Sequence, residues 1–178
     1  KGLDISGNGV FASDLWISGM GVGINLTGSD IQVWDWVCEI NYYYGIQVFG
    51  GTAMKIYDGI TFENQQAAIR VFNVVAAARA DNIKFSNITM HGDLLTGVTI
   101  QDSNGIEFTN VSATHSSNDR LNSYGFYASG SCSDIHFNGC NAWLGNQTTT
   151  PVGRAGFELA STSNGSFHLI DCSTNNWD

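Results

Sequence analysis

Carboxyl groups and one histidine are the clearest candidates for acid–base chemistry in this sequence. Glycoside hydrolysis uses two carboxyl groups, about 5 to 5.5 Å apart in retaining enzymes and about 6.5 to 9.5 Å apart in inverting ones. Glu39 and Glu63 are suited to the shorter pair, whereas Asp93 or Asp119 could pair with Glu63 at the longer distance. The predicted catalytic residues are Glu39, Glu63, Asp93 and His91, the last as a hydrogen-bond donor to a sugar or a carboxyl acid. The alternative interpretation is that the two glutamates are solvated surface residues.

A second group of side chains is suited to holding a sugar. Tyr127 and Trp143 present flat apolar faces with a polar edge, which match the apolar face of a sugar ring. The predicted substrate-binding residues are Arg70, Tyr127, Trp143, Asp119 and Glu158. Two alternatives stay open, because Arg70 could pair with Glu63 or Glu158 instead, and Trp143 could cover the core beneath a long loop.

An alternating pattern that recurs along the chain predicts the elements that hold these residues. A small residue followed by an apolar–polar–apolar triplet recurs every 22 to 31 residues, at 23–26, 45–48, 68–71, 97–100, 125–128 and 156–159. A second alternating triplet follows each, at 31–33, 54–56, 83–85, 106–108, 135–137 and 167–169, with 15–17 ahead of them all. Such alternation predicts strands that bury one face.

A third strand is predicted five or six residues after the start of each second triplet. It begins at Met20, Trp36, Ile60, Ile88, Val111, Cys140 and Cys172. The turn before it always ends in Gly, Asp or Asn, the residue types that tolerate a left-handed backbone. We therefore predict an all-β parallel β-helix of about seven three-strand rungs, with neighbouring rungs about 4.8 Å apart and residues 1–178 as a single domain. An antiparallel sandwich is the alternative, but its hairpins would not hold one turn constant.

This fold predicts a groove at the loop that joins each third strand to the next first strand. One outward position there holds Glu39, Glu63, His91, Thr114, Trp143 and Asn175 in successive rungs. The adjoining first strands present Gln47, Arg70, Thr99, Tyr127 and Glu158. The loop lengthens along the chain from 2 to 15 residues, and long loops on one side of a solenoid usually form its binding face.

Charge and apolar content exclude two kinds of partner. Seven basic and sixteen acidic side chains give a formal net charge of -9, which would repel a polyphosphate, so no nucleic-acid partner is predicted. The longest apolar stretch, residues 74–78, is far shorter than the roughly 20 residues of a membrane span, so no membrane segment is predicted.

The cysteines and the outward histidines do not predict a metal site. Cys38, Cys132, Cys140 and Cys172 lack metal-binding spacing, so neither a metal nor a cofactor is predicted. Cys140 and Cys172 fall at equivalent inward positions of neighbouring rungs, which favours a core stack over a disulfide. His136 and His168 lie outward on second strands and are interpreted as structural residues.

With this repeat, the sequence resembles the right-handed parallel β-helix superfamily, the pectate-lyase-like group that includes polygalacturonases, pectate and pectin lyases and phage tailspike depolymerases. The resemblance lies in the repeat and not in catalytic motifs. The adjacent Asp pair of polygalacturonases is absent, and the segment most similar to their Gly-His-Gly motif is Met-His-Gly-Asp at 90–93. The resemblance implies a right-handed coil and a polysaccharide bound along its outer face. For a tailspike, it also implies a homotrimer in an extracellular setting, either secreted or on a virion surface.

We therefore expect a polysaccharide-degrading hydrolase of the tailspike type. Elimination from a uronate requires a cation over the substrate carboxylate, but only Arg70 and Arg120 lie near the predicted groove, so hydrolysis is favoured over lyase chemistry. A lyase, a non-catalytic glycan- or receptor-binding module and a structural module remain as alternatives. Since solenoids need capped ends and no capping helix precedes Leu15, we also expect part of a longer chain or ends covered by partner subunits.

Overall fold

The computed structural model describes residues 1–73, 80–92, 95–115, 124–144, 155–160 and 165–175. These residues form sixteen strands that divide between two sheets. The first sheet consists of β1 (Leu3–Asn8), β3 (Val22–Ser29), β5 (Tyr44–Phe49), β7 (Ala67–Phe72), β9 (Thr96–Gln101), β11 (Tyr124–Ser129) and β14 (Ala155–Leu159). The second sheet consists of β2 (Phe11–Ser18), β4 (Gln32–Glu39), β6 (Lys55–Phe62), β8 (Asp81–His91), β10 (Asn104–His115), β12 (Ser133–Asn138), β13 (Asn141–Leu144), β15 (Phe167–Ile170) and β16 (Ser173–Asn175). Within the described ranges, no helix is long and apolar enough to cross a membrane.

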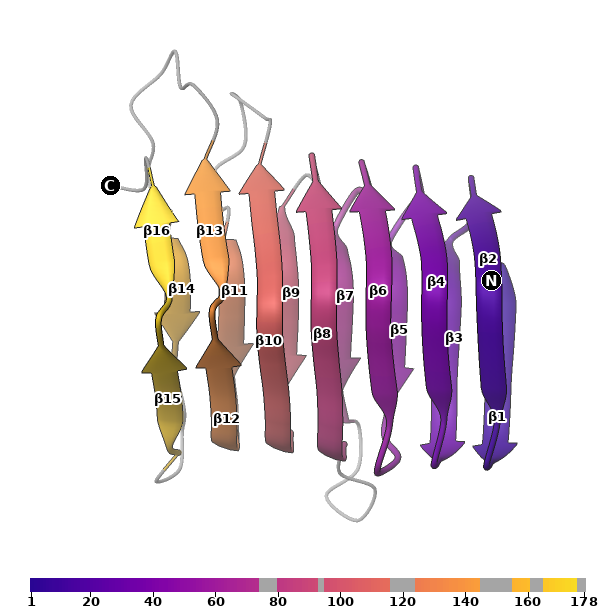
Figure 1. The fold of residues 1–178 in the computed structure, drawn as a ribbon, viewed down its shortest axis with the longest axis horizontal. Coiled ribbons are helices and arrows are strands. Elements are labelled where there is room, and N and C mark those ends of the chain that lie inside the picture. The colour runs from indigo at the N-terminus through magenta and orange to yellow at the C-terminus, as the bar shows by residue number, and fades with distance from the viewer. Residues whose placement is uncertain (74–79, 93–94, 116–123, 145–154, 161–164, 176–178) are drawn as a thin grey trace.

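The chain passes from one sheet to the other and back, and we call each such pass through both sheets a rung. Figure 1 shows the second sheet in front of the first, with the strands of successive rungs side by side. Every pairing is parallel and joins a strand to its counterpart in the next rung, as in β3 with β5 and β4 with β6. The prediction of an all-β chain with parallel strands is therefore confirmed, and the arrangement fits a parallel β-helix.

The two strands predicted on the second side of each rung are continuous in most rungs. In β4, β6, β8 and β10 a residue with positive φ in the middle of the strand bends it without ending it. These residues are Asp35, Asp58, Asn87 and Asn110, with φ between 50° and 54°. Only the last two rungs divide there, into β12 and β13 at Gly139 and into β15 and β16 at Asp171. The left-handed residue is the predicted one at Asp35, Asn87, Asn110, Gly139 and Asp171. In the two remaining rungs it is Asp14 instead of Gly19 and Asp58 instead of Gly59.

The structure differs from the predicted strand alignment at two places, residues 59–60 and residues 15–17. Gly59, not Ile60, pairs with Trp36, and a Cβ atom at Gly59 would lie 2.0 Å from Trp36 Cε2. The indole ring therefore occupies the space that a side chain would fill, and Ile60 points outward with 45% of its surface exposed. Leu15 also pairs with Trp36, so residues 15–17 belong after the bend rather than before it.

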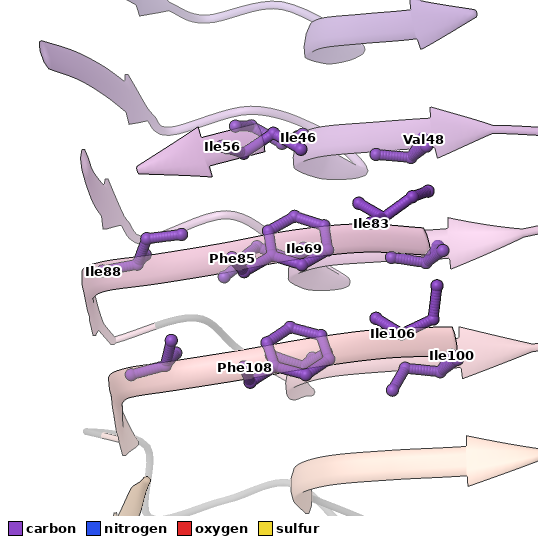
Figure 2. Packing of buried hydrophobic residues seen from close by; sticks show 14 of the residues in the cluster. Ile46, Val48, Ile56, Ile69, Ile83, Phe85, Ile88, Ile100, Ile106 and Phe108 are labelled. Atoms are coloured by element: carbon purple, nitrogen blue, oxygen red, sulfur yellow. The ribbon is translucent and has the colours of Figure 1, made fainter. Parts of the chain in front are cut away.

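The core lies between the sheets as stacks of like side chains, as predicted from the alternation. Figure 2 shows Phe85 lying over Phe108, and Ile83 and Ile106 following the same order from rung to rung. The rings of Phe85 and Phe108 are 4.8 Å apart between centroids and inclined by 6°. Since each aromatic side chain contributes a large apolar area, these stacks supply much of the folding free energy.

Cys140 and Cys172 are free thiols at neighbouring rungs, in agreement with the predicted core stack. Cys140 Sγ donates to the Phe108 carbonyl oxygen at 3.5 Å, and Cys172 Sγ donates to the Phe137 carbonyl oxygen at 3.4 Å. Burial raises the pKa of the Cys140 thiol to about 12. This thiol is therefore a core group with little thiolate at neutral pH.

Candidate functional site

The outer face of the first sheet carries the predicted row of sugar-binding side chains in one register. Arg70 pairs with Gln47 on one side and with Thr99 on the other. Tyr127 in turn lies between Thr99 and Glu158. The structure thus brings Arg70, Tyr127 and Glu158 onto one line across four strands, because equivalent positions of parallel strands face the same way.

Arg70 lies between two aromatic rings on this face. Its Nη1 donates to the Tyr44 hydroxyl oxygen at 2.6 Å, and its guanidinium carbon lies 4.9 Å from the Tyr44 ring centroid. The same carbon lies 3.9 Å from the Phe72 ring centroid, and Phe72 packs against Phe49 with centroids 5.0 Å apart. We call Tyr44, Phe49, Arg70 and Phe72 the Arg70 platform. Arg70 makes no ion pair with any described carboxylate, so the predicted pairing with Glu63 or Glu158 is not formed.

A polar ladder continues the row from the platform toward β1. Gln47 Nε2 donates to Asn25 Oδ1 at 2.8 Å, and Asn25 Nδ2 donates to Asp4 Oδ1 at 2.6 Å. The hydrogen bond from Asn25, aided by one from Lys1, lowers the pKa of Asp4. A hollow of about 610 Å³ lies over this ladder, with Phe49 and Phe72 among its lining residues. We call it the first-sheet hollow.

The other end of the row carries two tyrosines and a carboxylate. The rings of Tyr124 and Tyr127 are 5.0 Å apart between centroids and inclined by 31°. Burial, followed by the nearby Glu158 carboxylate, raises the pKa of the Tyr124 hydroxyl. Glu158 therefore interacts with Tyr124, and Tyr127 beside them presents a half-buried ring on the outer face.

The outward row predicted to hold Glu39, Glu63 and His91 contains Phe62 in place of Glu63. Glu39 pairs with Phe62, and Phe62 pairs with His91. Glu63 lies one residue further on, at a corner with φ of 51°. The six-residue spacing assumed for Ile60 caused this error, since a slip of one residue moves a side chain to the opposite face of a strand.

The structure does not bring the two glutamates together in one row. Glu39 accepts a hydrogen bond from Trp16 Nε1 at 3.1 Å, and Glu63 is exposed at its corner. His91 is exposed with its ring 6.5 Å from that of Phe62. Asp93 and Asp119 lie outside the described residues.

Trp143 occupies the position of this row expected from the sequence. It pairs with Thr114 on β10 and with Asn175 on β16. With 48% of its surface exposed, the indole ring is open to solvent rather than covering the core.

Sequence reasoning missed a charged hollow of about 500 Å³ on the second sheet, which we call the second-sheet hollow. Its lining includes Asp81, Lys84, Glu107, Asp134 and His136. Lys84 Nζ lies 2.7 Å from Glu107 Oε2, and this hydrogen bond lowers the pKa of Glu107. One carboxylate oxygen of Asp81 is buried without a hydrogen-bond partner among the described residues. The signal was present in the sequence, since Lys84, Glu107 and His136 are the middle residues of successive second triplets.

Comparison of the chain with protein-family models, with curated proteins and with solved structures finds no match.

Proposed function

We propose that the chain is a right-handed parallel β-helix that binds a polysaccharide along the outer face of the first sheet. The observation that carries this proposal is the register that aligns the Arg70 platform with Tyr127 and Glu158. Such a line offers rings, a guanidinium and a carboxylate at the regular spacing of parallel strands. Aromatic rings suit the apolar faces of sugar rings, and the charged groups suit their hydroxyl edges.

The Arg70 platform supports the proposal because it is preorganised. The hydrogen bond to Tyr44 and the contact with Phe72 fix the guanidinium in one orientation, so less side-chain entropy is lost on binding. A guanidinium has five N–H donors, and the others can bind sugar hydroxyl or carboxylate oxygens. The neighbouring first-sheet hollow, with Asn25 and Gln47 in its lining, provides room for further sugar units.

The test is retention of the chain by a panel of bacterial capsular, O-antigen and plant cell-wall polysaccharides in affinity electrophoresis. We expect at least one polysaccharide to retard the wild-type chain. Reducing ends and the ultraviolet absorbance of an unsaturated uronate, followed in the same samples, separate binding from hydrolysis and from elimination. Retardation by none of the polysaccharides would contradict the proposal.

Hydrolysis is the second candidate function, and the second-sheet hollow favours it. Glu107 is held ionised by Lys84, whereas Asp81 has a buried oxygen without a partner, so the two carboxyl groups have different surroundings. Carboxyl groups in unlike surroundings can divide the acid and base roles of hydrolysis. If reducing ends appear, Glu107→Gln should abolish their release. If Glu63→Gln abolished the release of reducing ends and Glu107→Gln did not, the catalytic residue would be Glu63, as expected from the sequence.

Self-association and an extracellular location complete the proposal. The outer face of the second sheet exposes Trp16, Ile60 and Phe62 by 73%, 45% and 42%. Exposed apolar side chains grouped on one face are typical of a surface that other subunits cover. It supports a homotrimer, which the resemblance to tailspikes implies together with a secreted or virion-surface setting.

A further inference from the structure

Two histidines stack on neighbouring strands beside the second-sheet hollow. His136 on β12 pairs with His168 on β15, and their rings are 4.5 Å apart between centroids and inclined by 10°. His136 Nε2 also lies 2.8 Å from Asp134 Oδ1. One potential ligand atom from each of Asp134, His136 and His168 lies within 4.8 Å of the others.

We propose that Asp134, His136 and His168 bind a divalent transition-metal ion, with Zn²⁺ as the best match to the ligand types. Zinc binds imidazole nitrogen at about 2.0 to 2.1 Å and carboxylate oxygen at about 2.0 to 2.2 Å. Tetrahedral ligands at those lengths lie about 3.3 Å from one another. The two imidazole rings must rotate out of their stack before a nitrogen of each can face one ion. All three side chains are at least partly exposed, which leaves room for that rotation.

The backbone around the three ligands is already fixed. His136 and His168 are held at neighbouring positions by the parallel ladder of β12 and β15. Asp134 sits at a corner with φ of 55°, where its N–H donates to Ser166 Oγ at 3.0 Å. The next N–H, of Ile135, donates to the Ser166 carbonyl oxygen at 3.0 Å. The segment that leads into β15 is therefore tied to the corner that bears the carboxylate.

The neighbouring charges do not oppose a cation. Glu107 is the counterpart of His136 on β10, and Lys84 occupies the next position on β8. Because Lys84 and Glu107 are paired with each other, their charges offset one another. Since Asp134 and His136 line the second-sheet hollow, a fourth coordination position is open toward it, where water or a ligand oxygen can bind.

The site would account for two outward histidines at equivalent positions of neighbouring rungs. A metal ion bound by both histidines would cross-link β12 and β15. This assignment is independent of glycan binding, since the Arg70 platform lies on the other sheet.

The test is titration of the chelator-treated chain with ZnCl₂ in isothermal titration calorimetry. We expect one Zn²⁺ per chain, loss of this binding in His136→Ala and His168→Ala, and weakened binding in Asp134→Asn. His91→Ala removes an exposed histidine on β8 and is the matched control, so it should bind Zn²⁺ as the wild type does. Circular dichroism checks that each variant is folded.

A second readout distinguishes this site from the cysteines. Co²⁺ at Asp134, His136 and His168 should give weak visible absorption without the intense ultraviolet band of thiolate ligands. Zn²⁺ should also raise the midpoint of thermal unfolding of the wild type but not of His168→Ala. No binding by the wild type, full binding by both histidine variants, or a thiolate band would overturn the assignment.

Discussion

Single residues decide which side chains the rungs present, and Gly59 shows this most clearly. Its missing side chain makes room for the Trp36 indole ring, whereas Ile60 beside it faces solvent. The register that follows moves Glu63 out of the row of Glu39 and brings Phe62 into it. The absence of one methyl group thus determines the composition of a surface several residues away.

We expect Gly59→Ala to destabilise the chain by about 3 kcal/mol, the upper end of the usual cost of overpacking. The added Cβ would lie 2.0 Å from Trp36 Cε2, and that ring is fully buried and cannot move aside. Urea unfolding followed by tryptophan fluorescence measures the difference. Gly21→Ala is the control, because its Cβ would be 3.7 Å from the nearest atom, in ordinary contact. Equal stability of the two variants would show that the Trp36 register is wrong.

At the scale of the strands, the left-handed bend of the second sheet is the feature that the sequence predicts best. A spacing of five residues and the residue types Asp, Asn and Gly identify it in most rungs, because few other residues adopt positive φ without strain. The six-residue spacing expected before Ile60 is the exception, since that bend lies at Asp58. The bend also carries its own ladder: Asn87 Nδ2 donates to Asp58 Oδ1, and Asn110 Nδ2 donates to Asn87 Oδ1, each at 2.9 Å.

Asn87→Ala should therefore cost about 2 kcal/mol, from two exposed hydrogen bonds and from the strain of alanine at a φ of 53°. Asn87→Gly loses the same hydrogen bonds but accepts the backbone angle, so it should cost about 1 kcal/mol less. Chemical unfolding of the two variants gives the difference. If alanine were tolerated as well as glycine, the backbone angle would not be a constraint at this bend.

The sequence predicts the strands and the residues that face the core, but it does not predict the register of Glu63 or the contacts of Arg70. Alternation marks Ile83, Phe85 and their counterparts as inward, and the first-strand row of Arg70 and Tyr127 follows from the same alternation. Gly59 gives no apolar signal at an inward position, so the register of Glu63 could not be found from the pattern. The contacts of Arg70 with Tyr44 and Phe72 depend on side-chain rotamers, which periodicity does not specify.

At the scale of the molecule, the two sheets present outer faces of different character. The first sheet carries the Arg70 platform and a polar ladder, whereas the second exposes Trp16, Ile60 and Phe62 at one end and a charged hollow toward the other. Parallel stacking makes both faces continuous across rungs, as Figure 1 shows. We therefore propose that one face binds a glycan and that the other associates with further copies of the chain.

If the second sheet forms the subunit contact, sedimentation equilibrium should give three times the mass of the chain. Ile60→Lys should shift the equilibrium toward the monomer, because it places a charge among the exposed apolar side chains of this face. Thr99→Lys adds the same charge on the first sheet and should leave the mass unchanged. A monomeric wild type, or dissociation caused by Thr99→Lys alone, would refute association through this face.

The most direct test of the glycan-binding account is the dissociation constant of Arg70→Ala for the polysaccharide that retards the wild type. We predict at least tenfold weaker binding, a loss of about 1.4 kcal/mol, because the variant removes the cation between Tyr44 and Phe72. Lys84→Ala removes a cation from the second sheet and should bind as the wild type does. Unchanged affinity of Arg70→Ala, with weaker binding by Lys84→Ala, would place the glycan on the opposite face and contradict the account.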